Sequence, residues 1–241
     1  MSLLIRNRIS LLVCDMAGTI INENGIIYKS IDNILTRLHI PITEEEKILW
    51  HGKDKKEILT HHIKKHIKIN ENNIINTAEK WLIEDLTNQY LKSNKATLMK
   101  PSLPNFFNKL QYNGIKIGLN TGYPATFQKT IINHFSLNSC IDAHISSEKV
   151  KWGRPYPYMI YRLMEECEIS NIKQVAKIGD TSNDMLEGRN AGCGLVIGVL
   201  SGASSETELR NAGADVILEN ITDLNKESMF GSFDPVDTFL L

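Results

Sequence analysis

Four polar residues each stand at or just beyond the end of an apolar run: Asp15, Thr121, Asp180 and Asp184. Such runs are typical of buried parallel strands, and the carboxyl ends of parallel strands meet at one edge of a sheet, where open α/β sheets bind ligands. Carboxylates held close together repel one another, and a hard divalent cation such as Mg²⁺ relieves that repulsion. Taken singly, these residues are more typical of a turn or a helix cap than of a functional site, so their shared placement carries the prediction.

Two further residues would give this edge of the sheet an affinity for anions. Gly122 follows Thr121, and a glycine at the start of a helix lets a backbone N–H approach an anion closely. Arg154 adds a fixed positive charge. An aspartate nucleophile at Asp15, a divalent cation and anion-binding groups together predict a phosphoryl-transfer site. The less specific interpretation is a surface charge at Arg154 and a helix cap at Thr121.

The composition excludes several classes of protein. The chain has 241 residues, of which 42% are hydrophobic and 23% charged, values typical of a soluble globular protein. Its net charge of −1 provides no global field for nucleic acid or an anionic membrane, so neither is an expected partner. The cysteines lie far apart without a CxxC pair, which argues against a zinc site or a disulfide scaffold and favours reduced thiols in the cytoplasm. No apolar run approaches the length of a membrane span, and no secretory pattern opens the chain.

Alternating strand-like and helix-like segments supply the elements that would position the polar residues. The strand-like runs after the first one cover 115–120, 143–146, 175–180, 195–199 and 215–218, and helical stretches fill the gaps. This alternation predicts parallel βαβ units, and therefore an α/β fold with a doubly wound, Rossmann-like parallel sheet.

A helical block interrupts this pattern after the first strand. There, apolar residues recur at helical spacing and no convincing strand is present. We therefore expect an α/β core domain over 1–22 and 100–241 and an inserted all-helical cap domain over 23–99. Within the block, residues 43–46 have the form of a capping box, and residues 70–94 are predicted to form one long amphipathic helix.

These features together are similar to those of the haloacid dehalogenase superfamily. Its four motifs can be identified at 15–19, at 121–122, at Arg154 and at 179–184. The resemblance covers about residues 8–220, and the helical block matches the cap domain of the family.

The resemblance implies a role for each matching residue. Asp15 would attack phosphorus and form an aspartyl-phosphate. The substrate and its phosphoryl group would be bound by Ala17, Gly18, Thr121, Gly122, Tyr123 and Arg154. Mg²⁺ would be bound by Asp15, the backbone carbonyl of Ala17 and Asp180, with Asp184 in support.

Two departures from the common pattern indicate one branch of the superfamily. Most of its phosphatases carry a second aspartate, a general acid/base, where this sequence has Ala17, and alanine cannot move a proton. They also carry lysine where it has Arg154. Both departures are shared with the phosphonatase (phosphonoacetaldehyde hydrolase) branch, which residues 187–192 also resemble. In that branch a cap-domain lysine forms a Schiff base with the substrate aldehyde, and the iminium accepts the electrons of the breaking C–P bond.

Lys55 matches the Schiff-base lysine of that branch. If Asp54 caps the next helix, Lys55 lies in its first turn, where the helix dipole disfavours a cation. Lys53 and Lys56 add like charge nearby. Both effects favour the neutral amine that a Schiff base requires.

Two alternatives stay open for Lys55. A lysine run at a helix start is commonly solvated, and ordinary sugar-phosphate phosphatases of the superfamily use a basic residue near this point of the cap only to bind substrate. The sequence also has His51 and Ile58 where the phosphonatase branch has methionine and histidine.

The sequence thus predicts a Mg²⁺-dependent hydrolase that cleaves the C–P bond of phosphonoacetaldehyde or a related 2-oxoalkylphosphonate. The alternative is a phosphatase acting on small phosphate monoesters, and the complete motif set disfavours a non-catalytic binder. We expect the cap to move about hinges near 22–25 and 96–101. A homodimer through the cap is a further expectation, and the apolar face of the 28–40 helix either forms it or packs within the cap.

Overall fold

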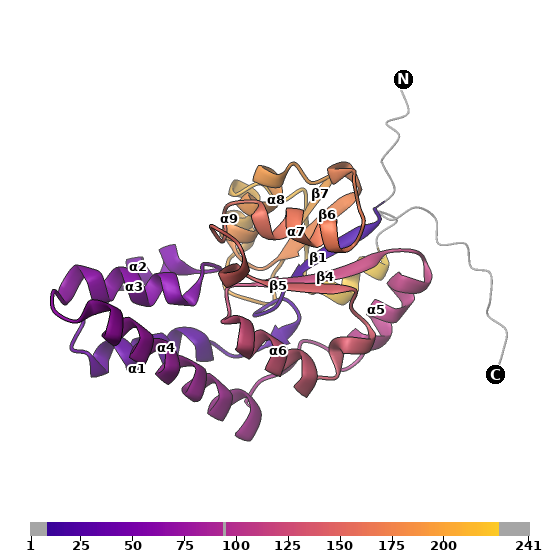
Figure 1. Ribbon diagram of the computed structural model, residues 1–241. Helices are drawn as coiled ribbons and strands as arrows, with labels where there is room; N and C mark the ends of the chain where they lie inside the picture. Colours follow the sequence, from indigo (N-terminus) through magenta and orange to yellow (C-terminus); the bar gives the residue numbers. More distant parts are fainter. Residues whose placement is uncertain (1–8, 94, 227–241) are drawn as a thin grey trace.

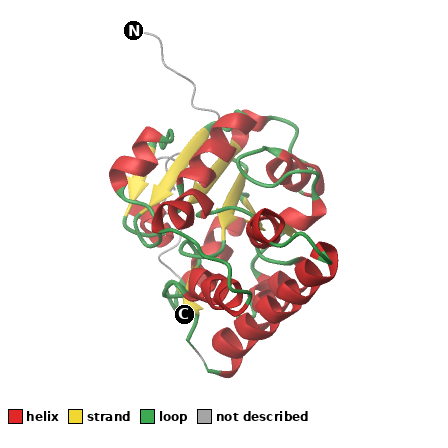
Figure 2. Ribbon diagram, turned by 90° about the vertical axis from the view of Figure 1, so that its left-hand side faces the viewer, coloured by secondary structure: helices red, strands yellow, loops and turns green. Residues whose placement is uncertain are grey.

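Residues 9–93 and 95–226 are described by a computed structural model, in which six strands form one parallel sheet in the order β5-β4-β1-β6-β7-β8. Helices cover both faces of this sheet (Figure 1; Figure 2). The predicted doubly wound α/β core is therefore confirmed, while its ends at 1–8 and 227–241 lie outside the described residues. None of the helices in the described ranges is long and apolar enough to cross a membrane.

The central strand, β1 (Leu11–Asp15), is a buried apolar run that ends in an aspartate. It pairs in parallel with β4 (Lys116–Thr121) on one side and with β6 (Val175–Gly179) on the other. Asp15 lies opposite Asn120 in this register. The residues that follow the three strands therefore share one edge of the sheet, as the sequence predicts.

The remaining elements of the core complete two helical layers. They are β5 (Ala143–Ser146), β7 (Leu195–Val199), β8 (Val216–Leu218), α5 (Leu103–Tyr112), α6 (Ala125–His134), α7 (Tyr158–Glu166), α8 (Ser182–Ala191) and α9 (Glu206–Asn211), with short 3₁₀ turns at Leu137–Ser139, Ser147–Lys149, Ile172–Gln174 and Ile221–Lys226. Along β1, Leu12 and Cys14 join the apolar cluster under α5 and α6, whereas Leu11 and Val13 join the cluster under α7 and α8. This alternation is the period-two pattern of a strand buried on both faces.

A block of helices lies to one side of the core, and we call it the helical insertion (Figure 1). It consists of α1 (Ile26–Arg37), α2 (Glu44–Trp50), α3 (Lys55–His66), α4 (Glu71–Thr87) and a π-helical turn (Asn88–Lys92). The short strands β2 (Ile21–Asn22) and β3 (Thr97–Leu98) flank it in sequence and pair with each other as an antiparallel ribbon. The ribbon lies next to both predicted domain boundaries, and the division into two domains stays a prediction.

The predicted helix over 70–94 is found as one continuous helical stretch from Glu71 to Lys92, but its last turn is π-helical, and residue 94 lies outside the described residues. The chain is α-helical to Thr87 and then widens into the π-helical turn. Thr87 Oγ1 donates to the backbone carbonyl of Ile83 at 2.6 Å, and such back-bonding bends helices. The turn buries Tyr90 completely, and this side chain reaches the core below.

Two other expectations about the helical insertion can be checked directly. The capping box is confirmed, because Thr43 N donates to Glu46 Oε2 at 3.0 Å and Glu46 N donates to Thr43 Oγ1 at 3.2 Å. The apolar residues of α1, among them Ile31 and Leu35, are buried in the cluster shared with α3 and α4. This face therefore packs within the chain and is not free for a dimer contact.

Candidate active site

Three carboxylates meet at the edge of the sheet. Asp15 ends β1, Asp180 follows β6, and Asp184 lies in the first turn of α8, where Thr181 and Asp184 form a capping box. One oxygen of each of the three carboxylates lies within 4.8 Å of the others, and all three residues are buried. The structure thus brings together the acidic residues that the sequence singled out.

Asp180 is held in a cradle that only small residues allow. Its Oδ1 accepts from Thr19 Oγ1 at 3.2 Å, and its Oδ2 accepts from the backbone N–H of Ala203 at 2.8 Å. A Cβ on Gly18, whose φ is +77°, would lie 2.4 Å from Asp180 Oδ2, and one on Gly202 would lie 1.9 Å from it. Two backbone segments can therefore approach the carboxylate closely because neither carries a side chain.

Asp184 is paired with cations inside the protein. Its Oδ1 lies 2.8 Å from Lys177 Nζ and 3.2 Å from Arg154 Nε, and its Oδ2 accepts from Thr181 Oγ1 at 2.5 Å. Burial acts to raise the pKa of Asp184, but the Arg154 and Lys177 charges outweigh it and lower that pKa. Asp184 is therefore ionised and already compensated, which suits a supporting position beside a metal rather than a sole ligand.

Arg154 contacts the predicted nucleophile directly. Its Nη1 lies 2.6 Å from Asp15 Oδ1, and both side chains are buried. The pKa of Asp15 is raised overall, because burial and the Asp184 charge outweigh the opposing charges of Arg154 and Lys177. A guanidinium at this distance favours the carboxylate form, which is the form that attacks phosphorus.

The residues present fit a bound Mg²⁺. Asp15, Asp180 and the backbone carbonyl of Ala17 offer oxygen donors only, which a hard cation prefers. Burial, followed by the Asp15 and Asp184 charges, raises the pKa of Asp180 well above its ordinary value. Among the described residues Asp180 has no cationic partner, so a divalent cation here would relieve the repulsion that raises its pKa. The roles of Asp15, Ala17 and Asp180 as metal ligands stay predictions.

A pocket of about 380 Å³ opens above the carboxylates. The core contributes all of the substrate-binding residues that the sequence predicted, namely Ala17, Gly18, Thr121, Gly122, Tyr123 and Arg154, together with Asp15 and Asp180. The helical insertion contributes Lys55, Tyr28, His51 and Gly52 to the lining of the same pocket. The structure therefore places Lys55 and Asp15 in one pocket, although they come from different parts of the fold.

Lys55 is the first residue of α3, as predicted, and Asp54 caps that helix by accepting from Glu57 N at 2.8 Å. The Lys55 side chain is buried, and its Nζ donates to the backbone carbonyl of Lys53 at 2.8 Å. Burial lowers the pKa of Lys55, and Arg154 lowers it further, against the opposing charge of Asp15.

The direction of this pKa shift agrees with the sequence argument, but its main cause differs. Lys56, which was expected to disfavour the charged form of Lys55, pairs with Glu79 at 2.7 Å and has a half-exposed side chain. Burial of Lys55 in the pocket, beside the Tyr28 ring at 5.4 Å, dominates instead. Sequence spacing could not reveal this, because the pocket is assembled from distant segments.

The loop before α3 is docked tightly on the core. Lys55 N donates to the Gly122 carbonyl at 3.1 Å, and Asn183 Nδ2 donates to the His51 carbonyl at 2.6 Å. A Cβ on Gly52, whose φ is +75°, would lie 2.3 Å from Thr181 Oγ1. The close approach at Gly52 and these backbone contacts hold Lys55 in the pocket that Asp15 also lines.

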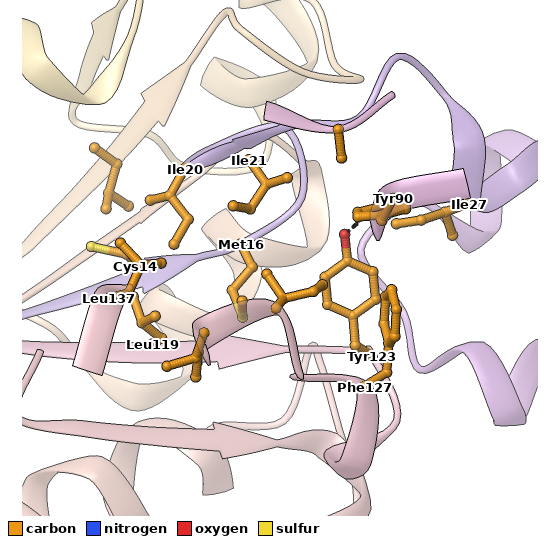
Figure 3. Packing of buried hydrophobic residues seen from close by; sticks show 14 of the residues in the cluster. Cys14, Met16, Ile20, Ile21, Ile27, Tyr90, Leu119, Tyr123, Phe127 and Leu137 are labelled. Carbon is orange, nitrogen blue, oxygen red and sulfur yellow. Dashed lines mark hydrogen bonds between the residues drawn. The ribbon is translucent and has the colours of Figure 1, made fainter. Parts of the chain in front are cut away.

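A buried polar chain joins the helical insertion to the core on the other side of the pocket. Tyr90 and Tyr123 share a hydrogen bond of 2.8 Å between their hydroxyls, drawn as a dashed line in Figure 3. The Tyr90 hydroxyl also lies 3.2 Å from Glu23 Oε2, which accepts from Ile27 N at 2.9 Å. The sequence did not single out Glu23, which lies within the first predicted hinge and lines the pocket.

The two sequence departures near Lys55 have different outcomes. His51 lines the pocket with its ring 4.5 Å from that of Tyr28, and burial lowers its pKa. Ile58 is buried in the apolar cluster and is not among the residues that line the pocket. The position at which the phosphonatase branch has a histidine is therefore a packing position here.

Comparison with known proteins identifies the family. The family described as haloacid dehalogenase-like hydrolase matches residues 12–198, and the chain belongs to this family of hydrolases. Within it, the chain is similar to the phosphonoacetaldehyde hydrolases of Bacillus thuringiensis (strain Al Hakam) and Bacillus anthracis. It is 38% identical to each over 117 residues, which cover 46% of this chain and 44% of the relative. The chain thus spans less than half the length of the curated relatives it matches.

Solved structures show the same fold. A phosphonoacetaldehyde hydrolase-like protein from Oleispira antarctica has a TM-score of 0.75 at 21% identity, over 92% of this chain and 91% of that one. A β-phosphoglucomutase from Clostridium difficile has a TM-score of 0.72 at 17% identity, over 90% of this chain and 93% of that one. Because these identities are low, the likeness concerns the fold alone.

Proposed function

We propose that the protein is a Mg²⁺-dependent hydrolase that cleaves the C–P bond of phosphonoacetaldehyde or a related 2-oxoalkylphosphonate. The observation that carries this proposal is the meeting of Lys55 and Asp15 in one pocket, with the pKa of Lys55 lowered by burial. A lysine with a lowered pKa is the group that condenses with a carbonyl, and a carboxylate at a strand end is the group that attacks phosphorus. The names of the partly matching curated relatives support the same substrate class.

The first half of the proposed reaction belongs to Lys55. Its neutral Nζ attacks the aldehyde carbon of the substrate, and loss of water leaves a protonated imine. The charged nitrogen of this imine lies two bonds from the carbon that carries phosphorus. It can therefore accept the electron pair of the C–P bond, so that an enamine leaves instead of an unstable carbanion.

The second half belongs to the carboxylate edge. Asp15 attacks phosphorus as the C–P bond breaks, which gives an aspartyl-phosphate on Asp15 and the enamine on Lys55. Arg154 and the hydroxyl of Thr121 would orient the phosphoryl oxygens, and Gly122 would let a backbone N–H approach them. Bound Mg²⁺ would neutralise the phosphoryl charge that otherwise repels Asp15. Protonation of the enamine and hydrolysis then release the aldehyde, and water releases phosphate from Asp15.

The alanine at position 17 is consistent with a reaction in which Lys55, and not a general acid, assists the leaving group. It lines the pocket, and in most phosphatases that the chain resembles the matching residue is the general acid that protonates an alkoxide leaving group, which a methyl group cannot do. An enamine leaving group needs no proton when the C–P bond breaks, because the iminium already holds the positive charge.

The test is to trap the imine. We expect incubation with phosphonoacetaldehyde and borohydride to give a reduced adduct that mass spectrometry locates on Lys55. Lys55→Arg should abolish the adduct, whereas Lys56→Arg, at the adjacent residue paired with Glu79, should keep it. Absence of a trapped lysine in the wild type, or trapping that survives Lys55→Arg, would overturn the proposal.

A phosphatase acting on small phosphate monoesters is the second candidate. It is favoured by Ile58, which is buried in the apolar cluster where the phosphonatase branch has a histidine. The bond from Lys55 Nζ to the Lys53 carbonyl is compatible with either candidate, since an ammonium group and an amine can both donate it. In a phosphatase Lys55 binds substrate as a cation and forms no imine. Turnover of phosphate monoesters without phosphonate cleavage would favour this candidate, and loss of all phosphate release in Asp15→Asn would be common to both.

A further inference from the structure

Arg154 is held on three sides by buried groups. Its Nη1 faces Asp15, at 2.6 Å, and the Gly52 carbonyl, at 3.3 Å. Its Nη2 donates to the backbone carbonyl of Asn120 at 3.0 Å and to the side-chain carbonyl at 2.7 Å. Its Nε donates to Glu187 Oε2 at 3.0 Å. The direction in which the guanidinium points is therefore set by groups beneath the pocket as well as by Asp15.

Glu187 is a buried carboxylate to which the proposed function gives no task. It lies on α8 and is fully buried, and it does not line the pocket. Asn120 Nδ2 donates to both of its oxygens, at 3.0 and 2.9 Å, and Arg154 Nε donates to one of them. A carboxylate taken out of water is destabilising unless it is paired with a cation. Two cations lie beside Glu187 Oε2, namely Arg154, whose Nε is 3.0 Å away, and Lys177, whose Nζ is 3.5 Å away.

Local packing brings Glu187 to this position. A Cβ on the adjacent Gly188 would lie 2.9 Å from Val196 Cγ2 and 3.0 Å from Lys177 Cβ. The absence of a side chain there lets α8 lie directly on β6 and β7, and Glu187 then reaches under the carboxyl end of β4.

Lys177 completes the network from the same strand layer. It is fully buried on β6, and its Nζ lies 2.9 Å from Asn120 Oδ1 and 2.8 Å from Asp184 Oδ1. Asn120 Oδ1 thus accepts from both cations, while its amide nitrogen donates to Glu187. This single side chain fixes the two cations and the deeper carboxylate relative to one another.

We propose that Glu187 is a positioning residue that acts through Arg154 and thereby sets the phosphoryl-binding geometry at Asp15. The Glu187 carboxylate binds Nε of Arg154 on the side away from the pocket, so that Nη1 is directed at Asp15. Without that charge, Asp15 and Asp184 are the carboxylates left beside the guanidinium, and Arg154 shifts toward them. After this shift the Arg154 guanidinium would lie closer to Asp15 and Asp184. Asp15 would then be less free to attack phosphorus, and Asp184 less free to support the metal. The proposal rests on the phosphoryl-binding role of Arg154 in the proposed function.

The experiment measures binding of inorganic phosphate, which needs neither Lys55 nor a phosphonate. In the presence of Mg²⁺, Glu187→Gln should weaken the calorimetric affinity for phosphate by ~10–100-fold, the loss typical of groups that orient ligands from behind. Glu165→Gln, an exposed glutamate of α7 paired with Arg162, is the matched control and should leave the affinity unchanged. Because the assay omits the aldehyde, a failed imine-trapping experiment leaves this result interpretable.

A double-mutant cycle separates positioning from general stability. In an Arg154→Lys background there is no Nε for Glu187 to hold, so Glu187→Gln should change phosphate affinity by less than about two-fold. An equal fold loss in both backgrounds would overturn the proposal, since it would show that Glu187 does not act through Arg154. Unchanged phosphate affinity in the single variant would overturn it as well.

A second variant covers the case in which Glu187→Gln does not fold. The pair Glu187→Gln with Lys177→Met removes one charge of each sign from the network and keeps its net charge. We expect this variant to regain the melting temperature but not the phosphate affinity. Full recovery of phosphate affinity would mean that Glu187 serves only as a counter-charge, and the proposal would be wrong.

Discussion

The backbone N–H of Lys55 donates to the carbonyl of Gly122 at 3.1 Å, which joins the proposed imine-forming residue to the proposed phosphoryl-binding loop. The two loops touch so closely that a Cβ on Gly122 would lie 2.4 Å from the Lys53 carbonyl oxygen. In this arrangement of the insertion on the core, main-chain contact sets the distance between the two groups of the proposed reaction.

Gly122→Ala should push the loop before α3 away from the core. Since a misplacement of about 1 Å can cost ~100-fold in rate, we expect kcat/KM for phosphate release to fall by roughly that factor with the fold retained. Gly114→Ala, at a glycine with no neighbour within 4 Å of the added Cβ, is the control for a general loss of stability, because its φ of +77° adds backbone strain that Gly122 does not have. Equal activity losses in the two variants would contradict the role of the Gly122 contact.

Lys55 should make the protein less stable at neutral pH than it would be without the charge. Its folded-state pKa is lowered by burial, so the folded protein binds fewer protons at this site than the unfolded chain does. Stability from this residue is therefore lowest at low pH and rises as the pH increases toward the unfolded pKa of about 10.4. Lys55→Met should raise the melting temperature at pH 7, and the gain should shrink as the pH is raised. A gain that grows with pH would contradict the shift.

The same shift should appear in the chemistry of Lys55. An amine is neutral above its pKa, so the rate of imine trapping should reach half of its plateau at a pH below the usual lysine value of about 10.4. Borohydride trapping of phosphonoacetaldehyde over a range of pH measures this midpoint, with free lysine under the same conditions as the reference. A midpoint equal to that of free lysine would show that burial does not tune the residue.

Asp180→Asn should make the melting temperature independent of Mg²⁺. In the wild type, Mg²⁺ should raise the melting temperature, because a ligand that binds only the folded state stabilises it by mass action. Asp180→Asn should lose this dependence and, since it removes a carboxylate whose pKa is raised by burial and by Asp15, should melt higher than the wild type in EDTA. Thermal scans of both proteins with and without Mg²⁺ provide the comparison, and an undiminished Mg²⁺ effect in Asp180→Asn would exclude it as a ligand.

Tyr90→Phe should weaken the attachment of the helical insertion to the core. The variant loses hydrogen bonds to Tyr123 and Glu23 in a buried setting, at a cost of about 1–3 kcal/mol in the free energy of unfolding. Tyr112→Phe, at a tyrosine that is 89% exposed, is the control and should cost almost nothing. Denaturant titration distinguishes them, and equal values would show that the tyrosine pair contributes nothing.

Sequence patterns predicted the parts of the site that depend on strand ends. Asp15, Thr121 and Asp180 follow apolar runs, and parallel strands bring such ends together whatever the rest of the chain does. Local capping was equally accessible, as at Asp54, because its partner lies three residues away.

The deeper layer of the site was not accessible in this way. Lys177 is a single lysine inside a strand-like run, and nothing local distinguishes a buried cation there from a solvent-facing one. Its partners Asn120 and Asp184 come from another strand and from a helix, so their meeting depends on the assembled tertiary structure. Glu187 was visible only as part of a resembling stretch, without a task.

The β2–β3 ribbon has a mechanical consequence. Both chain crossings between the helical insertion and the core run through it, and Ile21 and Asn22 are paired there with Leu98 and Thr97. Because the two connecting segments are hydrogen-bonded to each other, the ribbon bends about one axis. Two unpaired connections would also permit twisting and sliding. Motion of the insertion relative to the core stays a prediction, and we expect any such motion to be a swing about that ribbon. Lys55, Tyr28 and His51 would leave and return together, so that each closure presents the same wall to whatever occupies the carboxylate edge.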